Sequence, residues 1–424
     1  MIIEKLFCHK DKSILDVLKV INENSKSTAF IIDDDKKLCG IMTDGDIRRV
    51  LLRGADLQQP VGKVLSLNIT YAKKGEPVTE MLKMFNDRIR ILPIVDDEMK
   101  VVDYFEFRQD FHIPLVAPNL KGNEFKYLVD AFLSSWISSS GHYIERFENN
   151  FAGYCECKHG VAVSNGTAAL HLALLACGIG PEDEVIVPDL TFASPVNMVI
   201  HSSAKPVIVD VEPDSWCIDP DEIEKAITSK TKAIIIVHLY GQACDMNRIM
   251  AIAKKHKLFV IEDCAEAHGA VYAGKKVGSF GAVGCFSFFG NKVITTGEGG
   301  MCVTNSQEMN EKMRVLRDHG MNRNKKYWHD VVGFNYRMTN LQAAIGVAQL
   351  ERIGDVLKER ADVEKRYRKL LEEFDFIEFQ KDGLFKRNKI TWLVSVLIND
   401  GKRDHYLEQM KKNGIDARPF FFIR

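Results

Sequence analysis

Short apolar runs alternate with amphipathic segments through the middle of the chain. The runs read "HGVAVSN", "DEVIVPD", "KPVIVDVEP", "KAIIIVHLYG" and "LFVIEDC", and segments of helical period such as "TAALHLALLACG" and "MNRIMAIAKKH" separate them. Near-continuous Val/Ile strands with helices between them are typical of a parallel sheet covered on both faces. We therefore predict an α/β domain with a mostly parallel central sheet, in which ligands bind at the carboxyl ends of the strands.

A weak internal repeat occupies the first quarter of the chain. "LDVLKVINENS" is echoed by "TEMLKMFNDRI", and "AFIIDDDKKLCGIMTDGD" by "LPIVDDEMKVVDYFEFRQD". Each unit predicts an amphipathic helix, a short strand, an acidic turn, a second strand and the start of another helix. We expect the two units to stack as one α+β domain over residues 1–112. It ends at "HIPLVAPNLKGNE", where two prolines and a glycine interrupt the periodic segments.

Composition narrows the class of protein. A chain of 424 residues with 46% apolar residues predicts two or three globular domains, and a net charge of -1 gives no reason to expect nucleic acid or an anionic membrane as partner. The ten cysteines form no C-x-x-C pair and no metal-binding spacing, so we expect reduced thiols, a cytoplasmic setting and no metal. The charged start "MIIEKLFCHK" is unlike a signal peptide, and the apolar stretches are strand-sized, which predicts no membrane span.

Residues that could bind or react with a ligand follow the predicted strands. Gly166, Thr167 and Ala168 open a helix, where backbone N–H groups bind anions. Asp263 ends a buried strand and needs a cationic partner, either an arginine or a protonated heterocycle. Phe192 offers a face for a flat ring, and Lys292 lies in "SFFGNKVITTGEGGM". Alone, Lys292 reads as a surface lysine on a glycine-rich turn. Together, these groups are what pyridoxal phosphate requires.

Five blocks make the resemblance specific. "SNGTAALHLAL", "EDCAEAHGA", "SFGAVGCFSFFGNKVITTGEGGM", "WHDVVGFNYRMTNLQAAIG" and "RPFF" resemble the DegT/DnrJ/EryC1/StrS family of nucleotide-sugar aminotransferases over residues 114–424. The resemblance implies an aspartate aminotransferase-like (type I) fold, with a large domain at 113–340 and a small domain at 341–424. Family members continue past "RPFF", so the small domain is expected to be truncated.

The resemblance also implies roles for individual residues. Lys292 matches the lysine that bonds to the cofactor, and Asp263 the acid paired with the ring nitrogen. Ser287, with Gly166, Thr167 and Ala168, matches the site that holds the cofactor phosphate. Phe192 matches the aromatic that stacks on the ring, and Glu266 the residue beside the ring hydroxyl. Asn335 matches an asparagine that reaches the phosphate bound by a neighbouring subunit. The last of these implies a homodimer with shared active sites.

On the sugar side, the segment "SSWISSSGHYIERFE" matches the family's loop near the active site. Trp136, Ser138 and Ser139 are its candidate substrate residues. His329 in "YWHDVVG" is similar to a substrate-side histidine, although a packed or surface histidine is the alternative.

The implied reaction is a two-stage amino transfer. L-glutamate gives its amino group to the cofactor, and a nucleoside-diphosphate-linked 4-keto-6-deoxy sugar then receives it, with Lys292 moving the proton. Relatives that dehydrate sugars carry histidine at this position, so the lysine favours transamination. The pattern "SFFGNK.ITTGEGGM" is most similar to the branch that makes GDP-perosamine from GDP-4-keto-6-deoxymannose; a UDP-linked sugar is the next choice. Either product would feed surface polysaccharide or glycan synthesis.

The first 112 residues resemble a pair of CBS repeats, the adenosine-nucleotide-sensing module. Thr43 and Asp46 in "GIMTDGDIRR" match the pattern that holds ribose and phosphate, which implies a site for an adenine or guanine nucleotide. The second unit has Asp103 in place of the glycine, Glu106 in place of the threonine and Gln109 in place of the aspartate. A carboxylate in such a pocket would repel a phosphate. Two alternatives remain: a packing or dimerisation element without ligand, and a nucleotide-sensing regulator with a degenerate enzyme domain.

Overall fold

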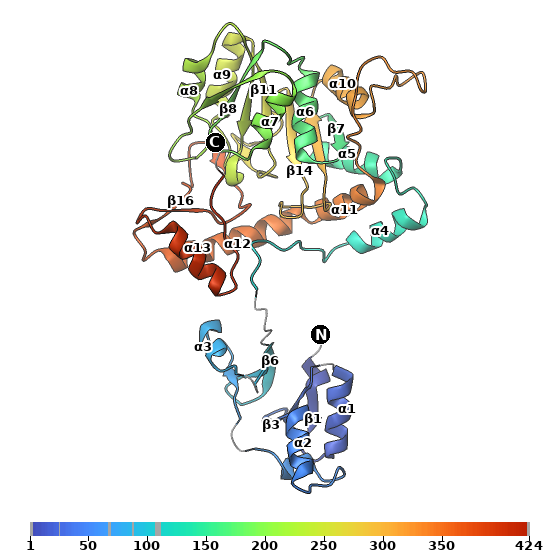
Figure 1. Ribbon diagram of the computed structural model, residues 1–424, viewed down its shortest axis with the longest axis vertical. Coiled ribbons are helices and arrows are strands. Elements are labelled where there is room, and N and C mark those ends of the chain that lie inside the picture. Colours follow the sequence, from blue (N-terminus) through green and yellow to red (C-terminus); the bar gives the residue numbers. More distant parts are fainter. Residues whose placement is uncertain (1–2, 25, 67–68, 87–88, 107–111, 422–424) are drawn as a thin grey trace. The chain divides into compact units, whose positions relative to one another are not determined.

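The protein divides into two compact units, Met1–Ile113 and Pro114–Arg424, in a computed structural model (Figure 1). The structure describes all residues except 1–2, 25, 67–68, 87–88, 107–111 and 422–424. No helix within these described residues is long and apolar enough to span a membrane.

The amino-terminal unit repeats one arrangement of helix and strands. Its first half consists of η1 (Ile3–Leu6), β1 (Phe7–His9), α1 (Ile14–Asn24), β2 (Thr28–Ile32), β3 (Leu38–Thr43), α2 (Asp44–Leu52) and η2 (Val61–Lys63). Its second half consists of β4 (Ala72–Lys73), α3 (Val78–Lys83), β5 (Ile91–Val95) and β6 (Val101–Glu106). Each half has a three-stranded sheet, in orders β1-β2-β3 and β4-β5-β6. The helix expected after β6 falls on 107–111, outside the described residues.

The two halves stack on each other, as the repeat predicts. The Leu38 N–H donates to the carbonyl of Met99 at 2.9 Å, and the Val101 N–H donates to the carbonyl of Lys36 at 3.2 Å. Phe30 in β2 shares a buried apolar cluster with residues of β5 and β6. The turns between the strands of each half therefore pair with each other across the repeat.

A seven-stranded sheet forms the centre of the second unit (Figure 1), in the order β7-β15-β14-β11-β10-β8-β9. The strands are β7 (His159–Val163), β8 (Glu184–Pro188), β9 (Lys205–Val209), β10 (Thr231–Val237), β11 (Phe259–Asp263), β14 (Val283–Ser287) and β15 (Gly300–Thr304). All neighbours are parallel except at β15, which is antiparallel to both β14 and β7. The mostly parallel sheet predicted from the Val/Ile runs is confirmed.

Both faces of this sheet are buried, because side chains of a strand alternate between its faces. In β10, Ile234 and Ile236 enter one apolar cluster, whereas Ala233 and Ile235 enter the other. The covering helices include α6 (Gly166–Ala176), α7 (Ser194–His201), α8 (Pro220–Ala226), α9 (Met246–His256) and α10 (Gln307–Arg317), with the short η3 (Leu239–Gly241) after β10. Helix α6 is apolar nearly all round and is accordingly a core helix.

The remaining elements of the second unit precede the central sheet, lie between its strands or follow it in the chain. They are α4 (Glu124–Leu133), α5 (His142–Tyr154), β12 (Val271–Tyr272), β13 (Lys275–Lys276), α11 (Asn340–Glu351), α12 (Ile353–Leu371), β16 (Ile377–Phe379), β17 (Arg387–Asn388), β18 (Val396–Ile398) and α13 (Arg403–Lys412). Strand β17 pairs with β12, and Trp392 together with Phe420 and Phe421 packs on the core of the central sheet. The boundary at 341 stays a prediction.

Candidate active site

A cavity of about 990 Å³ opens at the carboxyl ends of the central strands. Eight residues singled out in the sequence line it, although they come from five separate stretches of the chain: Gly166, Thr167, Ala168, Phe192, Asp263, Glu266, Ser287 and Lys292. Its volume suits a flat cofactor together with a further ligand. The strand-end rule thus locates this group of residues correctly in the fold.

The amino terminus of α6 forms one end of the cavity. A Cβ on Gly166 would lie 2.8 Å from the Cβ of Ser287, so the absence of a side chain lets the helix start approach the end of β14. The side chain of Asn165 caps the helix and accepts the N–H of Ala168 at 2.8 Å. The Ala168 N–H is therefore engaged within the chain, and its role toward an anion stays a prediction. The N–H groups of Gly166 and Thr167, which have no intrahelical partner, remain for that purpose.

Asp263 lies at the end of β11 and is buried. Its Oδ1 accepts the N–H of Ala265 at 3.0 Å, and its backbone carbonyl accepts the N–H of His238 from the neighbouring strand. Burial raises the pKa of the Asp263 carboxyl, while the hydrogen bond from Ala265 and the nearby Lys292 oppose the rise. Such a carboxyl stabilises a cationic group placed in the cavity.

The amine of Lys292 lies 3.8 Å from a carboxylate oxygen of Glu266. Burial lowers the pKa of Lys292, although Glu266 and Asp263 oppose this shift. Burial also raises the pKa of Glu266 to about 7, against the effects of Lys292 and of the Tyr240 N–H that it accepts at 2.9 Å. Both shifts favour the neutral forms of the amine and the carboxyl, and perturbed pairs of this kind are typical of functional sites.

The far wall of the cavity was not predicted from the sequence. It includes Trp392, Arg418 and Phe421, and Phe421 makes an edge-on contact with Phe192 at 5.6 Å between ring centroids. The segment "RPFF" carries Arg418, but nothing local in the sequence places that side chain near Lys292. The tertiary packing of the carboxyl-terminal segment on the sheet brings these residues in.

Five other candidates lie outside the lining of this cavity as the described residues form it. The carbonyls of Trp136 and Ser138 accept hydrogen bonds from the side-chain and backbone nitrogens of Asn340, which fixes their loop, and Ser139 follows in the same loop. His329 bonds through Nδ1 to the carbonyl of His319 at 2.9 Å. The Oδ1 of Asn335 accepts from Arg337 at 3.1 Å.

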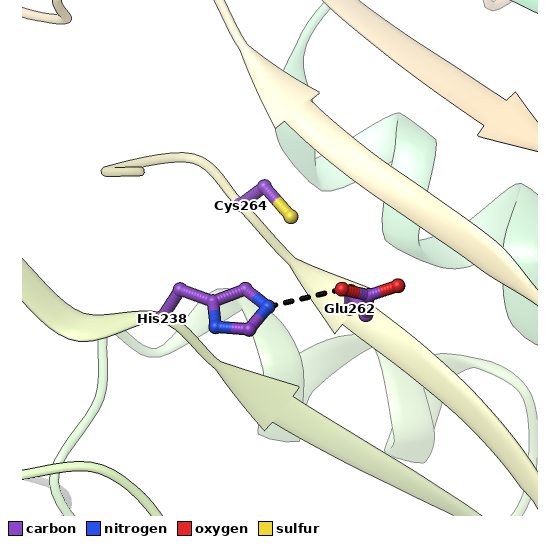
Figure 2. A group of neighbouring side chains, drawn as sticks. All are labelled: His238, Glu262 and Cys264. Atoms are coloured by element: carbon purple, nitrogen blue, oxygen red, sulfur yellow. Dashed lines mark hydrogen bonds and ion pairs between the residues drawn. The ribbon is translucent and has the colours of Figure 1, made fainter. Parts of the chain in front are cut away.

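Three buried side chains gather around the ends of β10 and β11, from residues that include both sequence neighbours of Asp263 (Figure 2). His238, Glu262 and Cys264 bring their side-chain atoms within 4.8 Å of one another, close enough for a metal site. His238 Nδ1 accepts the N–H of Cys244 at 3.1 Å, so the proton is on Nε2, which donates to Glu262 at 3.1 Å. With both ring nitrogens engaged, the histidine has no lone pair left for a metal ion.

The carboxylate of Glu262 is equally occupied. Its oxygens accept backbone N–H groups at 2.6 to 2.7 Å from a single turn, formed by Gly278, Phe280 and Gly281. A buried carboxylate with this many donors is a stable structural group. We interpret it as the anchor between β10, β11 and the 278–281 turn.

In the amino-terminal unit, Thr43 and Asp46 form a capping box at the start of α2. The Asp46 carboxylate accepts both the backbone N–H and the hydroxyl of Thr43, at 3.0 and 2.7 Å. In the second half, Glu106 pairs with Lys26 at 2.6 Å. Asp103, which replaces the glycine of the first half, lies in β6 and is exposed. Gln109 lies outside the described residues.

Comparison with known proteins identifies the enzyme unit. Residues 118–424 match the DegT/DnrJ/EryC1/StrS aminotransferase family, and residues 1–53 match the CBS domain. The chain is 48% identical to GDP-perosamine synthase of Caulobacter vibrioides over 312 residues, which are 73% of this chain and 84% of the relative. It is 46% identical to GDP-perosamine synthase of Vibrio cholerae, over 73% of this chain and 85% of that one.

Solved structures agree with this grouping. The chain is similar to a putative sugar aminotransferase of Streptococcus pneumoniae in its PLP form, with a TM-score of 0.68 and 28% identity over 72% of this chain and 83% of that chain. The aminotransferase of Psychrobacter cryohalolentis gives a TM-score of 0.66 and 34% identity over 70% and 82%. The chain therefore belongs to the DegT/DnrJ/EryC1/StrS aminotransferase family, as a sugar aminotransferase whose cofactor is pyridoxal phosphate.

Proposed function

We propose that this enzyme transfers the amino group of L-glutamate to GDP-4-keto-6-deoxymannose at the cavity around Lys292. The observation that carries the proposal is the position of the Lys292 amine, 3.8 Å from Glu266 in a cavity that also holds Asp263 and an anion-binding helix terminus. The choice of a GDP-linked sugar rests on the relatives named GDP-perosamine synthase.

The side chains present fit pyridoxal phosphate. The absence of a side chain at Gly166 lets the start of α6 lie against Ser287, because an added Cβ would clash with it; this close approach suits a phosphate held by Ser287 together with the N–H groups of Gly166 and Thr167. Asp263 has one oxygen engaged by Ala265, so the other is available to a protonated ring nitrogen. Phe192 lines the cavity and is 57% exposed, so its face can stack on the ring.

The cofactor, when bound, supplies an electron sink for removal of a proton from the carbon that carries the amino group. Lys292 moves that proton at its Nζ, and burial lowers the pKa of this amine, which favours the neutral form that a base requires. Glu266, with a pKa of about 7, accepts or returns the proton at its carboxylate oxygen 3.8 Å away. Asp263 would hold the ring nitrogen, and the positive charge of that nitrogen would oppose the effect of burial on the Asp263 carboxyl.

The carboxylate of the amino donor has a candidate binding group in Arg418. Its guanidinium lines the cavity, lies 5.8 Å from the ring centroid of Trp392, and has no hydrogen-bonded partner among the described residues. A guanidinium binds a carboxylate through two parallel hydrogen bonds. We assign the carboxylate of L-glutamate to this position.

The residues outside the cavity are assigned to a homodimer. Trp136, Ser138, Ser139, His329 and Asn335 do not line the cavity of their own chain, although Phe334 and Tyr336 on either side of Asn335 do. Helix α4, which precedes the first loop, exposes the large apolar side chains Phe125, Phe132 and Leu133, and exposed apolar side chains of this kind suit an interface with a second copy. In such a dimer these polar side chains complete the sugar and phosphate sites of the partner.

The amino-terminal unit is proposed to bind an adenine or guanine nucleotide at Thr43 and Asp46, and so to tune the enzyme. For a nucleotide to bind there, the Asp46 carboxylate would have to release the hydroxyl of Thr43 and accept a hydrogen bond from the ligand instead. If kinetic constants and their response to added nucleotides are unchanged after deletion of residues 1–112, this regulatory proposal is wrong.

A two-stage assay tests the substrate proposal. The enzyme is first loaded with amino groups by L-glutamate, the excess is removed, and GDP-4-keto-6-deoxymannose or a UDP-linked 4-keto-6-deoxy sugar is added. We expect an amino sugar in the GDP reaction, read by mass spectrometry, and at most slow reaction with UDP. Faster reaction with the UDP-linked sugar would refute the assignment of the nucleotide.

A further inference from the structure

The indole of Trp392 covers the reactive end of Lys292. The Nζ atom lies 4.1 Å from the centroid of the indole ring, although the two residues are far apart in the sequence. Trp392 is only 2% exposed, so this contact is shielded from solvent. A cation over an aromatic face is attracted by the ring quadrupole, most strongly over tryptophan and when the cation is desolvated.

The orientation of the indole is fixed by the backbone of the lysine segment itself. The Nε1–H of Trp392 donates to the carbonyl of Asn291 at 2.8 Å. Arg360 in α12 donates to the carbonyl of Trp392 and, at 3.2 Å, to the carbonyl of Lys292. Tyr240 stacks on the indole with 5.8 Å between ring centroids and 16° between planes. The indole is thus held rigidly beside the chain that carries the amine.

Several ionisable groups surround the same amine. Those that act on it are Asp263 at the end of β11, Glu266 and His268 in the segment that follows, and Arg418 near the carboxyl terminus; Arg360 in α12 bonds to the backbone carbonyl of the same lysine. The two carboxylates favour the ammonium form, whereas Arg418 and burial disfavour it. The indole adds to this balance without carrying a charge or a proton of its own, so it favours the ammonium without competing for its proton.

We propose that the face of Trp392 is the place where the free ammonium of Lys292 rests, and that this contact favours the protonated amine while it waits to deliver its proton. The inference rests on the proposed role of Lys292 as the proton carrier. The proton leaves Nζ for the substrate carbon, the lysine becomes a neutral amine, and the indole is unchanged. Trp392 therefore influences the pH at which Lys292 acts as acid or base.

The first test measures the amine directly in the full-length protein freed of cofactor. Potassium cyanate carbamoylates neutral amines, and peptide mass spectrometry gives the rate at Lys292 as a function of pH. With Trp392→Leu we expect the midpoint of this profile to fall by about one pH unit, equivalent to a tenfold change in the ionisation constant. With Trp392→Phe, which keeps an aromatic face but loses the indole N–H, we expect less than half of that change.

A second test keeps the shape of the side chain. Incorporation of fluorinated tryptophans weakens the quadrupole of the ring stepwise. We expect the midpoint at Lys292 to fall with each added fluorine. The chain has four tryptophans, so the matched control is the Trp392→Phe variant labelled in the same way, whose midpoint should not respond to fluorination.

The proposal is overturned by a wild-type midpoint in Trp392→Leu, by equal shifts in the Leu and Phe variants, or by no trend with fluorination. If the Leu variant does not fold, the fluorinated series decides alone. The visible spectrum of the wild-type protein with pyridoxal phosphate distinguishes a failure of the proposed role of Lys292 from a failure of the role of Trp392. No absorption band would refute the role of Lys292, whereas a normal band with an unresponsive midpoint would refute only the role of Trp392.

Discussion

Replacement of Gly166 by alanine tests the start of α6 as the phosphate site. The added Cβ would lie 2.8 Å from the Cβ and 3.3 Å from the Cα of Ser287. Neither atom is the end of a flexible chain, and β14, which Ser287 ends, is hydrogen-bonded in the middle of the sheet. The helix start must therefore move away, at a cost of about 1–3 kcal/mol for overpacking. If this cost falls on the geometry of the site, the dissociation constant of pyridoxal phosphate rises about 5- to 150-fold.

The assay is a titration of the cofactor-free protein with pyridoxal phosphate, followed by absorbance, with thermal unfolding measured in parallel. Gly180→Ala is the matched control, because no atom of the described chain lies within 4 Å of its added Cβ apart from its neighbours in sequence. We expect wild-type affinity for the control. Wild-type affinity for Gly166→Ala as well would show that the cofactor phosphate does not depend on this helix start.

Three further changes test other parts of the site. The carboxyl of Glu266 has a pKa of about 7 in the folded protein, so between about pH 4.5 and pH 7 the folded chain holds a proton that the unfolded chain has released, and the wild type loses stability as the pH rises. In the cofactor-free protein, Glu266→Gln should reduce this loss. Thermal melts as a function of pH measure it. Glu262→Gln should lower the free energy of unfolding by about 3–5 kcal/mol, since an amide cannot accept all the N–H donors around it, and urea titration measures the loss. Dialysis against EDTA should leave the stability of the wild type unchanged. Arg418→Gln should raise the KM for L-glutamate at least about tenfold and leave the KM for the sugar nearly unchanged, whereas equal effects on both would contradict a donor-carboxylate site.

The elements of the sheet and the centre of the site were readable from the sequence for the same physical reason. Buried parallel strands are continuous apolar runs, so their ends are visible, and Asp263 and Gly166 lie at such ends. The role of Asn165 was also accessible, because asparagine before a helix is a common cap that consumes one of the first N–H groups. That cap engages the N–H of Ala168, so only Gly166 and Thr167 keep free N–H groups at the helix start.

Long-range contacts had no such local signal. Trp392 lies in a segment of weak periodicity, and only the packing of the carboxyl-terminal elements puts its ring over Lys292. Glu106 was expected to repel a phosphate, but nothing in the pattern indicated that Lys26 of the first repeat neutralises it at 2.6 Å. Pairings of this kind depend on tertiary structure rather than on residue type or spacing.

The visible absorption spectrum with pyridoxal phosphate, before and after addition of L-glutamate, tests the central claim most directly. We expect a yellow absorption band in the wild-type protein that is lost on addition of glutamate, and no such band in Lys292→Ala. A band of equal strength in Lys292→Ala, or a wild-type band that glutamate leaves unchanged, would contradict the account of Lys292 as the residue that binds the cofactor and carries the proton in amino transfer.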